Sequence, residues 1–169
     1  MNVGRVVRLA FCSTIVLFAA SSLPAQQAPP AAPVPAPILS AHTVFLANGG
    51  MDATSMNEFK ALDVSYTEPY DSFYAAVQAW GRYQIVSSPA AADLVLELGV
   101  TAPMAACGAP QALQNTVRIY DGKTHFLLWT VTQPVKAANL KGTWRKNIAA
   151  AIAEVVSQLK TLAAATPAH

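Results

Sequence analysis

Residues 115–135 hold the pattern that most restricts how this chain folds, two β-branched, apolar stretches on either side of a turn. Asn115–Tyr120 precedes Asp121-Gly122, and Thr124–Val135 follows it. Asp-Gly between two such stretches is typical of a β-hairpin, and glycine is favoured where the turn needs positive φ. The sequence therefore predicts an antiparallel hairpin with a tight turn and a positive φ at Gly122. A chain with this hairpin must build a β-sheet.

Three further stretches have the character of strands. Asp93–Thr101 alternates in hydrophobicity, with Leu94, Leu96, Leu98 and Val100 on one face. His42–Ala47 is apolar and ends at Asn48-Gly49-Gly50, a turn signal, and Arg82–Ser87 is a short candidate strand. With the hairpin, these stretches predict a sheet of about five strands.

Two segments have the periodicity of amphipathic helices. The first begins near Pro69 and ends at Gly81, which suits a left-handed cap position. The second begins near Thr143 as N-cap and continues to Leu162. Met51–Tyr66 has no clear periodicity and is predicted to be a long loop. The helices have apolar stripes made of Tyr70, Phe73, Tyr74, Val77 and Trp80, and of Ile148, Ile152, Val155, Val156, Leu159 and Leu162.

The order of elements is strand, helix, four strands, helix. Two helices can cover one face of a mixed sheet of about five strands. The predicted fold class is therefore α/β, an α+β two-layer sandwich, with Trp129 and the Leu94 series packing the sheet against the helices.

The N-terminal region has the features of an export signal. Arg5 and Arg8 precede an apolar run over residues 9–20, and Leu23-Pro24-Ala25 is a plausible cleavage site. The sequence predicts a signal peptide at 1–25, a Pro/Ala-rich linker at 26–38, one domain at 39–163 and a disordered tail at 164–169. A retained leader that tethers the protein to a membrane is the alternative. Lipidation is rejected, because Phe11 precedes Cys12.

The net charge and the number of cysteines exclude some kinds of protein and some kinds of cross-link. Without the two arginines of the leader, 11 Lys+Arg become 9, equal to the 9 Asp+Glu. A neutral mature chain lacks the basic surface that nucleic-acid binding needs. Only Cys107 remains after cleavage, so no internal disulfide forms. Cys107 is either a loop thiol of no consequence, a link between two chains or a reactive group.

Three stretches carry a resemblance to known proteins: Tyr70–Val86, the run PAAADLVLEL at 89–98, and Val117–Trp129, which contains YDGKT. In these stretches the chain resembles uncharacterised secreted proteins of acidobacteria. More distantly it is similar to periplasmic α/β modules such as the N-terminal domain of TolB, and to lipoprotein domains of unknown function. The resemblance implies an envelope location and, by analogy, an interaction role. It supplies no catalytic residues, and the chain departs from the lipoproteins in lacking a lipidation cysteine.

Candidate catalytic residues are few. Glu97, Asp121 and His125 are the polar groups on strands or strand ends that an uncharacterised small hydrolase would use, and Cys107 with His125 and Asp121 is a conceivable triad. The alternative is that Asp121 and His125 are turn residues. No metal-ligand spacing is found, and Gly122-Lys123-Thr124 lacks the rest of a phosphate-binding loop, so neither metal nor cofactor is expected.

A basic cluster precedes and begins the last helix, where positive charge opposes the helix dipole. It is a candidate site for an anionic partner, such as a lipid headgroup or an acidic cell-wall polymer. The alternative is a solvated face. The cluster consists of Lys136, Lys141, Arg145 and Lys146.

Tyr66 and Tyr70 are a second candidate site. Exposed side by side, they would form an aromatic ledge for a sugar or peptide. The alternative is that they pack in the core and at the helix entry.

The sequence as a whole favours an exported cell-envelope protein with a non-catalytic domain that binds another envelope protein. Strand addition at a free sheet edge is the expected mode. The competing hypotheses are a peripheral membrane or cell-wall binder that uses the basic cluster, and a small hydrolase.

Overall fold

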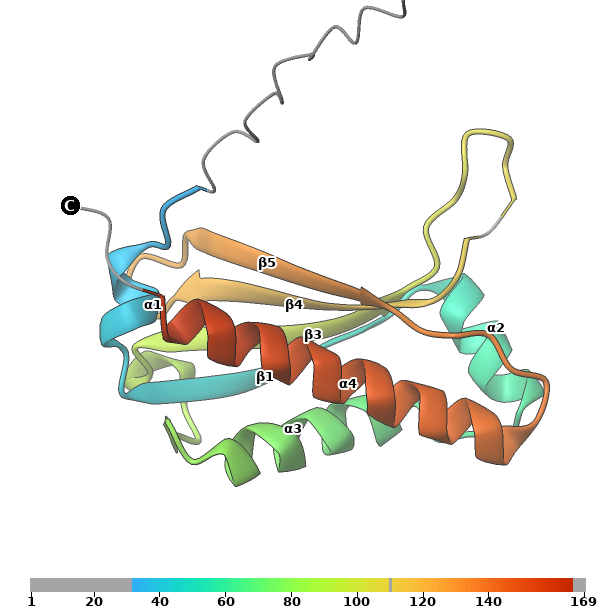
Figure 1. The fold of residues 1–169 in the computed structure, drawn as a ribbon, viewed down its shortest axis with the longest axis horizontal. Helices are drawn as coiled ribbons and strands as arrows, with labels where there is room; N and C mark the ends of the chain where they lie inside the picture. Colours follow the sequence, from blue (N-terminus) through green and yellow to red (C-terminus); the bar gives the residue numbers. More distant parts are fainter. Residues whose placement is uncertain (1–31, 110, 166–169) are drawn as a thin grey trace, which may run out of the picture. The chain divides into compact units, whose positions relative to one another are not determined.

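The computed structural model describes residues 32–109 and 111–165 (Figure 1). The predicted signal peptide at 1–25, the first part of the predicted linker and the last residues of the predicted tail lie outside the described residues. The unit that begins at Ala32 contains all the helices and strands of the described residues.

A mixed five-stranded sheet forms one layer, with strand order β2-β1-β3-β4-β5. β1 pairs in parallel with both β2 and β3, whereas the β3–β4 and β4–β5 pairs are antiparallel. The predicted fold class is confirmed. The strands are β1 (Thr43–Met51), β2 (Gln84–Ile85), β3 (Leu94–Thr101), β4 (Gln114–Asp121) and β5 (Leu127–Pro134).

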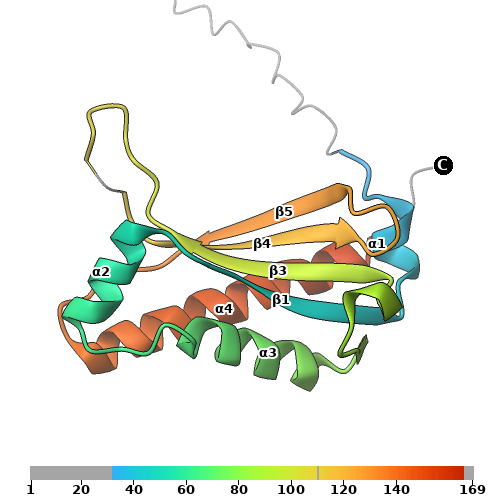
Figure 2. The same ribbon diagram turned by 180° about the vertical axis from the view of Figure 1, so that it is seen from behind.

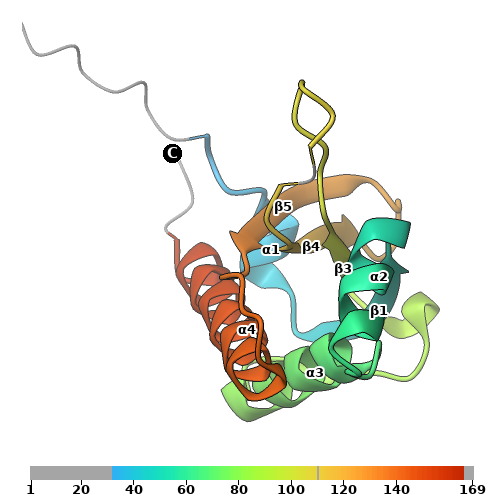
Figure 3. The ribbon, with the colours of Figure 1, turned by 90° about the vertical axis from the view of Figure 1, so that its right-hand side faces the viewer.

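Two long helices, α3 (Glu68–Trp80) and α4 (Lys141–Ala163), form the second layer. Figures 2 and 3 show both helices on the same side of the sheet. The leucines of β3 and the apolar stripe of α4 are buried between the layers, because alternate residues of a strand and every third or fourth residue of a helix share a face. The predicted pattern of Leu94, Leu96, Leu98 and Val100 is borne out, with each at most 2% exposed.

The folded part starts earlier than the predicted boundary at residue 39. A short helix, α1 (Ala36–Ser40), follows Pro35, and Ile38 inside it is buried. The guanidinium of Arg82 donates a hydrogen bond of 3.0 Å to the carbonyl oxygen of Leu39. The proline-rich composition of 26–38 conceals this helix, because proline is also accepted in the first turn of a helix.

The prediction of a loop over residues 51–66 was wrong, because α2 (Ala53–Ala61) lies within it. Asp52 is the N-cap, and its Oδ1 accepts a 2.7 Å hydrogen bond from the backbone N–H of Ser55. Its Oδ2 accepts a second, also 2.7 Å, from the N–H of Ala102 after β3. Only Ser55 and Phe59 of this helix are buried, so its apolar stripe is too narrow to be seen in the sequence.

The ends of two strands also differ from the predicted positions. β1 continues through Asn48-Gly49-Gly50 instead of turning there, and the pairing with β3 shifts between Asn48 and Gly50. Gly50 has φ +76°, as glycine-containing bulges allow. The predicted strand at 82–87 shrinks to the two residues of β2, before the 3₁₀ turn at Pro89–Ala91. Glycine in this strand therefore marks a bulge that the sequence pattern could not distinguish from a turn.

The hairpin between β4 and β5 forms, but its turn differs from the prediction. Gly122 is not among the residues with positive φ; His125 is, with φ +59°. Gly122 is needed for another reason, since a Cβ there would fall on the carbonyl oxygen of Ala92 and lie 2.9 Å from its carbonyl carbon. β5 then begins at Leu127, three residues later than the predicted strand at 124.

The start of α4 also corrects a prediction. The helix begins at Lys141 with Leu140 in the N-cap position and no side-chain cap, so Thr143 is a helical residue and not the cap. In contrast, α3 ends at Gly81 with φ +70°, as the sequence predicts. Ala164, where the disordered tail was predicted to begin, is the C-cap of α4.

Candidate functional site

The free edge of β5 is the most distinctive surface of the described residues. β5 is the last strand in the sheet order, with β4 as its only strand neighbour. Its eight residues, LLWTVTQP, include no charged side chain. Natural sheets protect such edges with charges, bulges, prolines or short strands, because unpaired N–H and C=O groups recruit another strand. Within β5 there are two such features, an irregularity at Leu128, where the register with β4 shifts, and Pro134 at the end of the strand.

The hydrogen-bond pattern shows which groups of β5 face outward. The N–H of Val135 donates to the carbonyl of Leu113 at 2.7 Å, and from Gln114 to Ile119 the register with β4 has no shift. In an antiparallel pair, alternate residues point their backbone groups at the partner strand. Gln133 and Val131 therefore bond towards β4, and the N–H and C=O groups of Thr130 and Thr132 point away from the sheet.

A groove lies between the end of β5 and the middle of α4. It encloses about 320 Å³ and has a floor of small side chains from the helix. Gln133 reaches across from the strand to accept a 3.0 Å hydrogen bond from Gln158 of α4. A strand added beside β5 would run over this groove and direct alternate side chains into it. The groove is lined by Gln133, Pro134, Lys136, Asn147, Ala150, Ala151 and Glu154.

The opposite edge of the sheet is protected over its first part. β2 covers only Thr43 and Val44 of β1, and the next outward carbonyl, that of Leu46, accepts a 2.9 Å hydrogen bond from the hydroxyl of Tyr70. Burial raises the pKa of that hydroxyl above its usual value. On this side, therefore, the edge strand β2 has two residues and the next outward carbonyl of β1 is engaged by a side chain, whereas β5 is an edge strand of eight residues.

The predicted aromatic ledge is not assembled from Tyr66 and Tyr70. Tyr66 is 48% exposed and lies 6.3 Å from the ring of Phe59. Tyr70 is half-buried, bonds to Leu46 and pairs with Tyr74 at 6.5 Å instead. Tyr70 and Tyr74 together line a hollow of about 280 Å³ beside the end of β2.

The predicted basic cluster is divided by the fold. Lys141 Nζ lies 2.8 Å from Asp63 Oδ2, and Arg145 Nε lies 3.0 Å from Glu68 Oε2. These ion pairs explain positive charge in the first turns of α4, because they join it to the segment before α3 and to the first residue of α3. Within the described residues Lys136 and Lys146 form no ion pair. Lys136 instead borders the groove beside β5.

The residues proposed for a hydrolase lie apart. Glu97, in the middle of β3, pairs with Arg118 of β4 at 3.1 Å, on the face that carries neither long helix. Asp121 and His125 lie in the β4–β5 turn. Cys107 is exposed in the loop at the opposite end of β4, a strand about 24 Å long at the usual rise per residue. The conceivable triad of Cys107, His125 and Asp121 is therefore contradicted.

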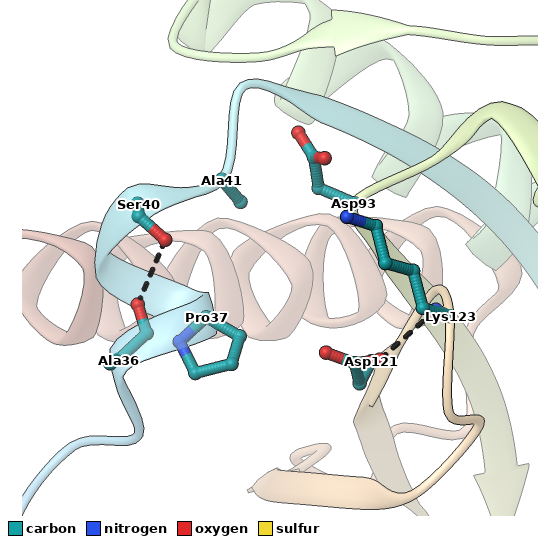
Figure 4. Close-up of a pocket in the computed structure, with 7 residues that line it drawn as sticks. All are labelled: Ala36, Pro37, Ser40, Ala41, Asp93, Asp121 and Lys123. Carbon is teal, nitrogen blue, oxygen red and sulfur yellow. Dashed lines mark hydrogen bonds between the residues drawn. The ribbon is translucent and has the colours of Figure 1, made fainter.

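A hollow of about 320 Å³ lies at the hairpin end of the sheet (Figure 4). The two carboxylates that line it, those of Asp93 and Asp121, accept hydrogen bonds from backbone N–H groups. Asp93 Oδ2 accepts 2.9 Å hydrogen bonds from the N–H groups of His42 and Thr43, which lower the pKa of Asp93. Asp121 Oδ1 accepts bonds from Thr124 and Lys123, which lower the pKa of Asp121. Both carboxylates therefore hold strand ends together in their ionised form.

The described part of the chain has neither a metal-binding cluster nor a helix suited to crossing a membrane. No group of three or more His, Cys, Asp or Glu side chains within residues 32–109 and 111–165 has an arrangement that could hold a metal ion. Among the helices of the same residues, none has the length and apolar character needed to cross a membrane.

Comparison with known proteins gives weak similarity only. No family model matches the chain, and no curated protein matches it. Among solved structures it is similar to a PelC dodecamer from Paraburkholderia phytofirmans, at 16% identity over 69% of this chain and 85% of that one, with TM-score 0.38. It is also similar to protein XCC0632 from Xanthomonas campestris, assigned to DUF330, at 14% identity over 77% and 89%, with TM-score 0.41.

A third similar structure is lipoprotein GNA1162 from Neisseria meningitidis, at 12% identity over 71% of this chain and 99% of that one, with TM-score 0.34. At these sequence identities and TM-scores, the similarities support no statement about what this chain does. The candidate site therefore depends on its own geometry, which brings together the β5 edge and the groove beside it.

Proposed function

We propose that this chain is an exported cell-envelope protein whose domain binds another envelope protein by adding an extended segment of that protein to β5. Export is supported by the sequence of the leader, with Arg5 and Arg8 before an apolar run and a proline-rich linker behind it. The single observation that carries the binding mode is the long, uncharged outer edge of β5.

The contrast between the two sheet edges supports this assignment. A sheet that avoided all strand addition would protect both edges. This sheet shortens β2 and engages the Leu46 carbonyl with Tyr70, yet leaves Thr130 and Thr132 with outward backbone groups. The groove beside α4 gives side chains of the added segment a place to lie, which main-chain pairing alone does not provide.

Replacing Thr130 by proline tests the proposal with little disturbance of the fold. Proline removes the backbone N–H, and at residue 130 that donor points away from β4. Thr130→Val is the matched control, since it changes the side chain and keeps the donor. The full chain carrying each change is cross-linked in cells, recovered from the envelope fraction and analysed by mass spectrometry.

We expect a specific partner protein to be recovered with the parent chain and with Thr130→Val, and to be lost with Thr130→Pro. Circular dichroism and the melting temperature establish that all three chains are folded. Equal recovery by the three folded chains, or no specific partner for any of them, rules out binding at this edge.

A further inference from the structure

The groove beside β5 presents two opposite charges to a segment that binds there. Lys136 and Glu154 both line it, and both residues are exposed. Neither side chain forms an ion pair within the described residues. Glu58 of α2 lines a separate, smaller hollow with Lys136, but no ion pair joins those two residues either. The groove therefore has one ammonium group and one carboxylate available to a partner.

The neutral polar side chains of the groove are already engaged. Asn147 Nδ2 donates a 2.8 Å hydrogen bond to the carbonyl oxygen of Lys136. Gln133 Oε1 accepts a 3.0 Å hydrogen bond from Gln158 Nε2. The rest of the lining, apart from the two charged residues, has no polar side-chain atom and consists of Pro134, Ala150 and Ala151. Charge and shape are therefore the properties by which this groove can select a partner.

The two charges lie at different points along the edge of the sheet. α4 runs back along the sheet in the direction opposite to β5 (Figure 1). Its Asn147 is bonded to Lys136, just beyond the end of β5, whereas Gln158 is bonded to Gln133 inside the strand. Glu154 lies between these two helix positions, two turns or about 10 Å after Asn147. The positive charge is therefore beside the end of β5, and the negative charge is further back along it.

An extended segment matches this spacing. Alternate side chains of a strand lie on one face, so residues i and i+4 that both point into the groove are about 13 Å apart. The long side chain of Lys136 covers the difference from the separation along the helix. The side chain at i+2 then lies over Ala150 and Ala151, where small residues leave space for a larger apolar group.

We propose that the segment added at β5 carries an acidic, an apolar and a basic side chain at alternate positions. The acidic side chain pairs with Lys136 and the basic one with Glu154, so in an antiparallel segment the acidic residue comes first along the chain. Complementary charges of this kind set specificity and register more than affinity. The inference rests on the proposed function and names the kind of segment that β5 accepts.

Reversal of each charge tests the match. The full chain with Lys136→Glu, with Glu154→Lys or with both changes is cross-linked in cells and recovered from the envelope fraction, in parallel with the parent chain. Lys146→Glu is the matched control, because Lys146 is also an exposed lysine with no ion pair in the described residues and does not line the groove. Mass spectrometry measures the amount of partner recovered with each chain.

Each single reversal should lower the recovery of the partner several-fold. The double reversal should lower it at least as much, although its net charge equals that of the parent, and Lys146→Glu should leave it unchanged. Circular dichroism identifies any variant that fails to fold. A partner that is lost with Thr130→Pro but is recovered equally with both reversals overturns this inference and leaves the proposed function intact. A partner retained with folded Thr130→Pro overturns the proposed function instead.

Carbodiimide cross-linking of the unaltered chain gives a second readout, which needs no variant. The reagent joins an amine directly to a carboxylate in contact with it, without a spacer. In the envelope fraction, Lys136 should be joined to an Asp or Glu of the partner that has a Lys or Arg four residues away, and Lys146 should not be joined to that segment. A segment without such a pair of charges, or equal joining at Lys146, overturns the inference.

Discussion

The ring of Phe59 meets the ring of Trp144 edge-on, with centroids 4.2 Å apart and an interplanar angle of 89°. Phe59 is completely buried and Trp144 is 2% exposed. The pair joins α2 to the first turns of α4, two segments more than 80 residues apart. The contact explains why residues 53–61 are helical despite their weak pattern, because a helix places Phe59 and Ser55 on the side facing the core.

Removing either ring should therefore destabilise the domain strongly. Phe59→Ala and Trp144→Ala are each expected to lower the free energy of unfolding by about 3–5 kcal/mol, from lost burial and the cavity left behind. The double variant should lose less than the sum, by about 0.5–1.5 kcal/mol, for the edge-to-face contact. Urea unfolding of the four chains measures this, and strict additivity would show that the rings do not interact.

Gly122 is expected to be intolerant of any side chain. A Cβ at this residue would collide with the carbonyl of Ala92, which belongs to backbone and has little freedom to retreat. Gly122→Ala should lower the free energy of unfolding by about 2 kcal/mol or more.

Gly142→Ala is the matched control for Gly122→Ala. Nothing lies within 4 Å of a Cβ added at Gly142, and this residue is in the first turn of α4. The change should leave the domain as stable as before or raise its stability by up to about 1 kcal/mol, because alanine favours helix. Thermal melts compare the two variants, and equal destabilisation would contradict the close approach at Ala92.

Asp52 and Asp93 should make the domain sensitive to acid. Burial raises the pKa of Asp52, but hydrogen bonds from Ser55 and Ala102 outweigh it and leave that pKa below its ordinary value. The pKa of Asp93 is lowered by the N–H groups of His42 and Thr43. A carboxyl group whose pKa is lower in the folded state stabilises the fold above its unfolded pKa, and this contribution is lost as the pH falls through the folded pKa.

Unfolding free energy should therefore be constant above about pH 5 and decline below pH 4, where these carboxylates take up protons. Asp52→Ala should cost about 1–2 kcal/mol at neutral pH, as loss of an N-cap does, and should flatten the acid decline. Glu154→Ala, an exposed helix position, is the control. An acid decline as steep in Asp52→Ala as in the parent would contradict a role for Asp52.

The ion pairs of α4 should contribute to stability and not only to surface charge. Lys141→Glu with Arg145→Glu places like charges against Asp63 and Glu68, so the urea midpoint should fall. Lys136→Glu with Lys146→Glu changes the net charge equally and touches no described ion pair. Its midpoint should stay close to that of the parent, and a fall of the same size in both double variants would mean that net charge alone is responsible.

Helices and strands could be predicted from the sequence where the local hydrophobic pattern and the capping residues determine them. The alternation at Leu94–Val100 marks β3, and Pro69 with Gly81 marks the two ends of α3, because periodicity and caps act within a few residues. α2 was missed because its apolar stripe is limited to Ser55 and Phe59, although Asp52 caps it locally, and contacts distant in sequence, with Ala102 and Trp144, hold it in place. Gly122 was assigned a positive φ that His125 has instead, since the close approach of Ala92 is not visible in the turn sequence.

The candidate site was predictable only in part. The lack of charge from Leu127 to Pro134 can be read in the sequence, but that β5 is an edge strand follows from the strand order. Likewise Lys141 and Arg145 appear as an anion site in the sequence because their partners Asp63 and Glu68 lie nearly 80 residues away. Edges and ion pairs are set by topology, which local pattern does not specify.

Hydrogen exchange at Thr130 and Thr132 tests the central proposal most directly. Their amides should exchange rapidly in the purified chain, because they face away from β4, while those of Val131 and Gln133 should be protected. In the chain recovered from envelope extract with its partner, the Thr130 and Thr132 amides should become protected as well. Amides at 130 and 132 that are already protected in the isolated protein, or that still exchange rapidly in the complex, would contradict strand addition at β5.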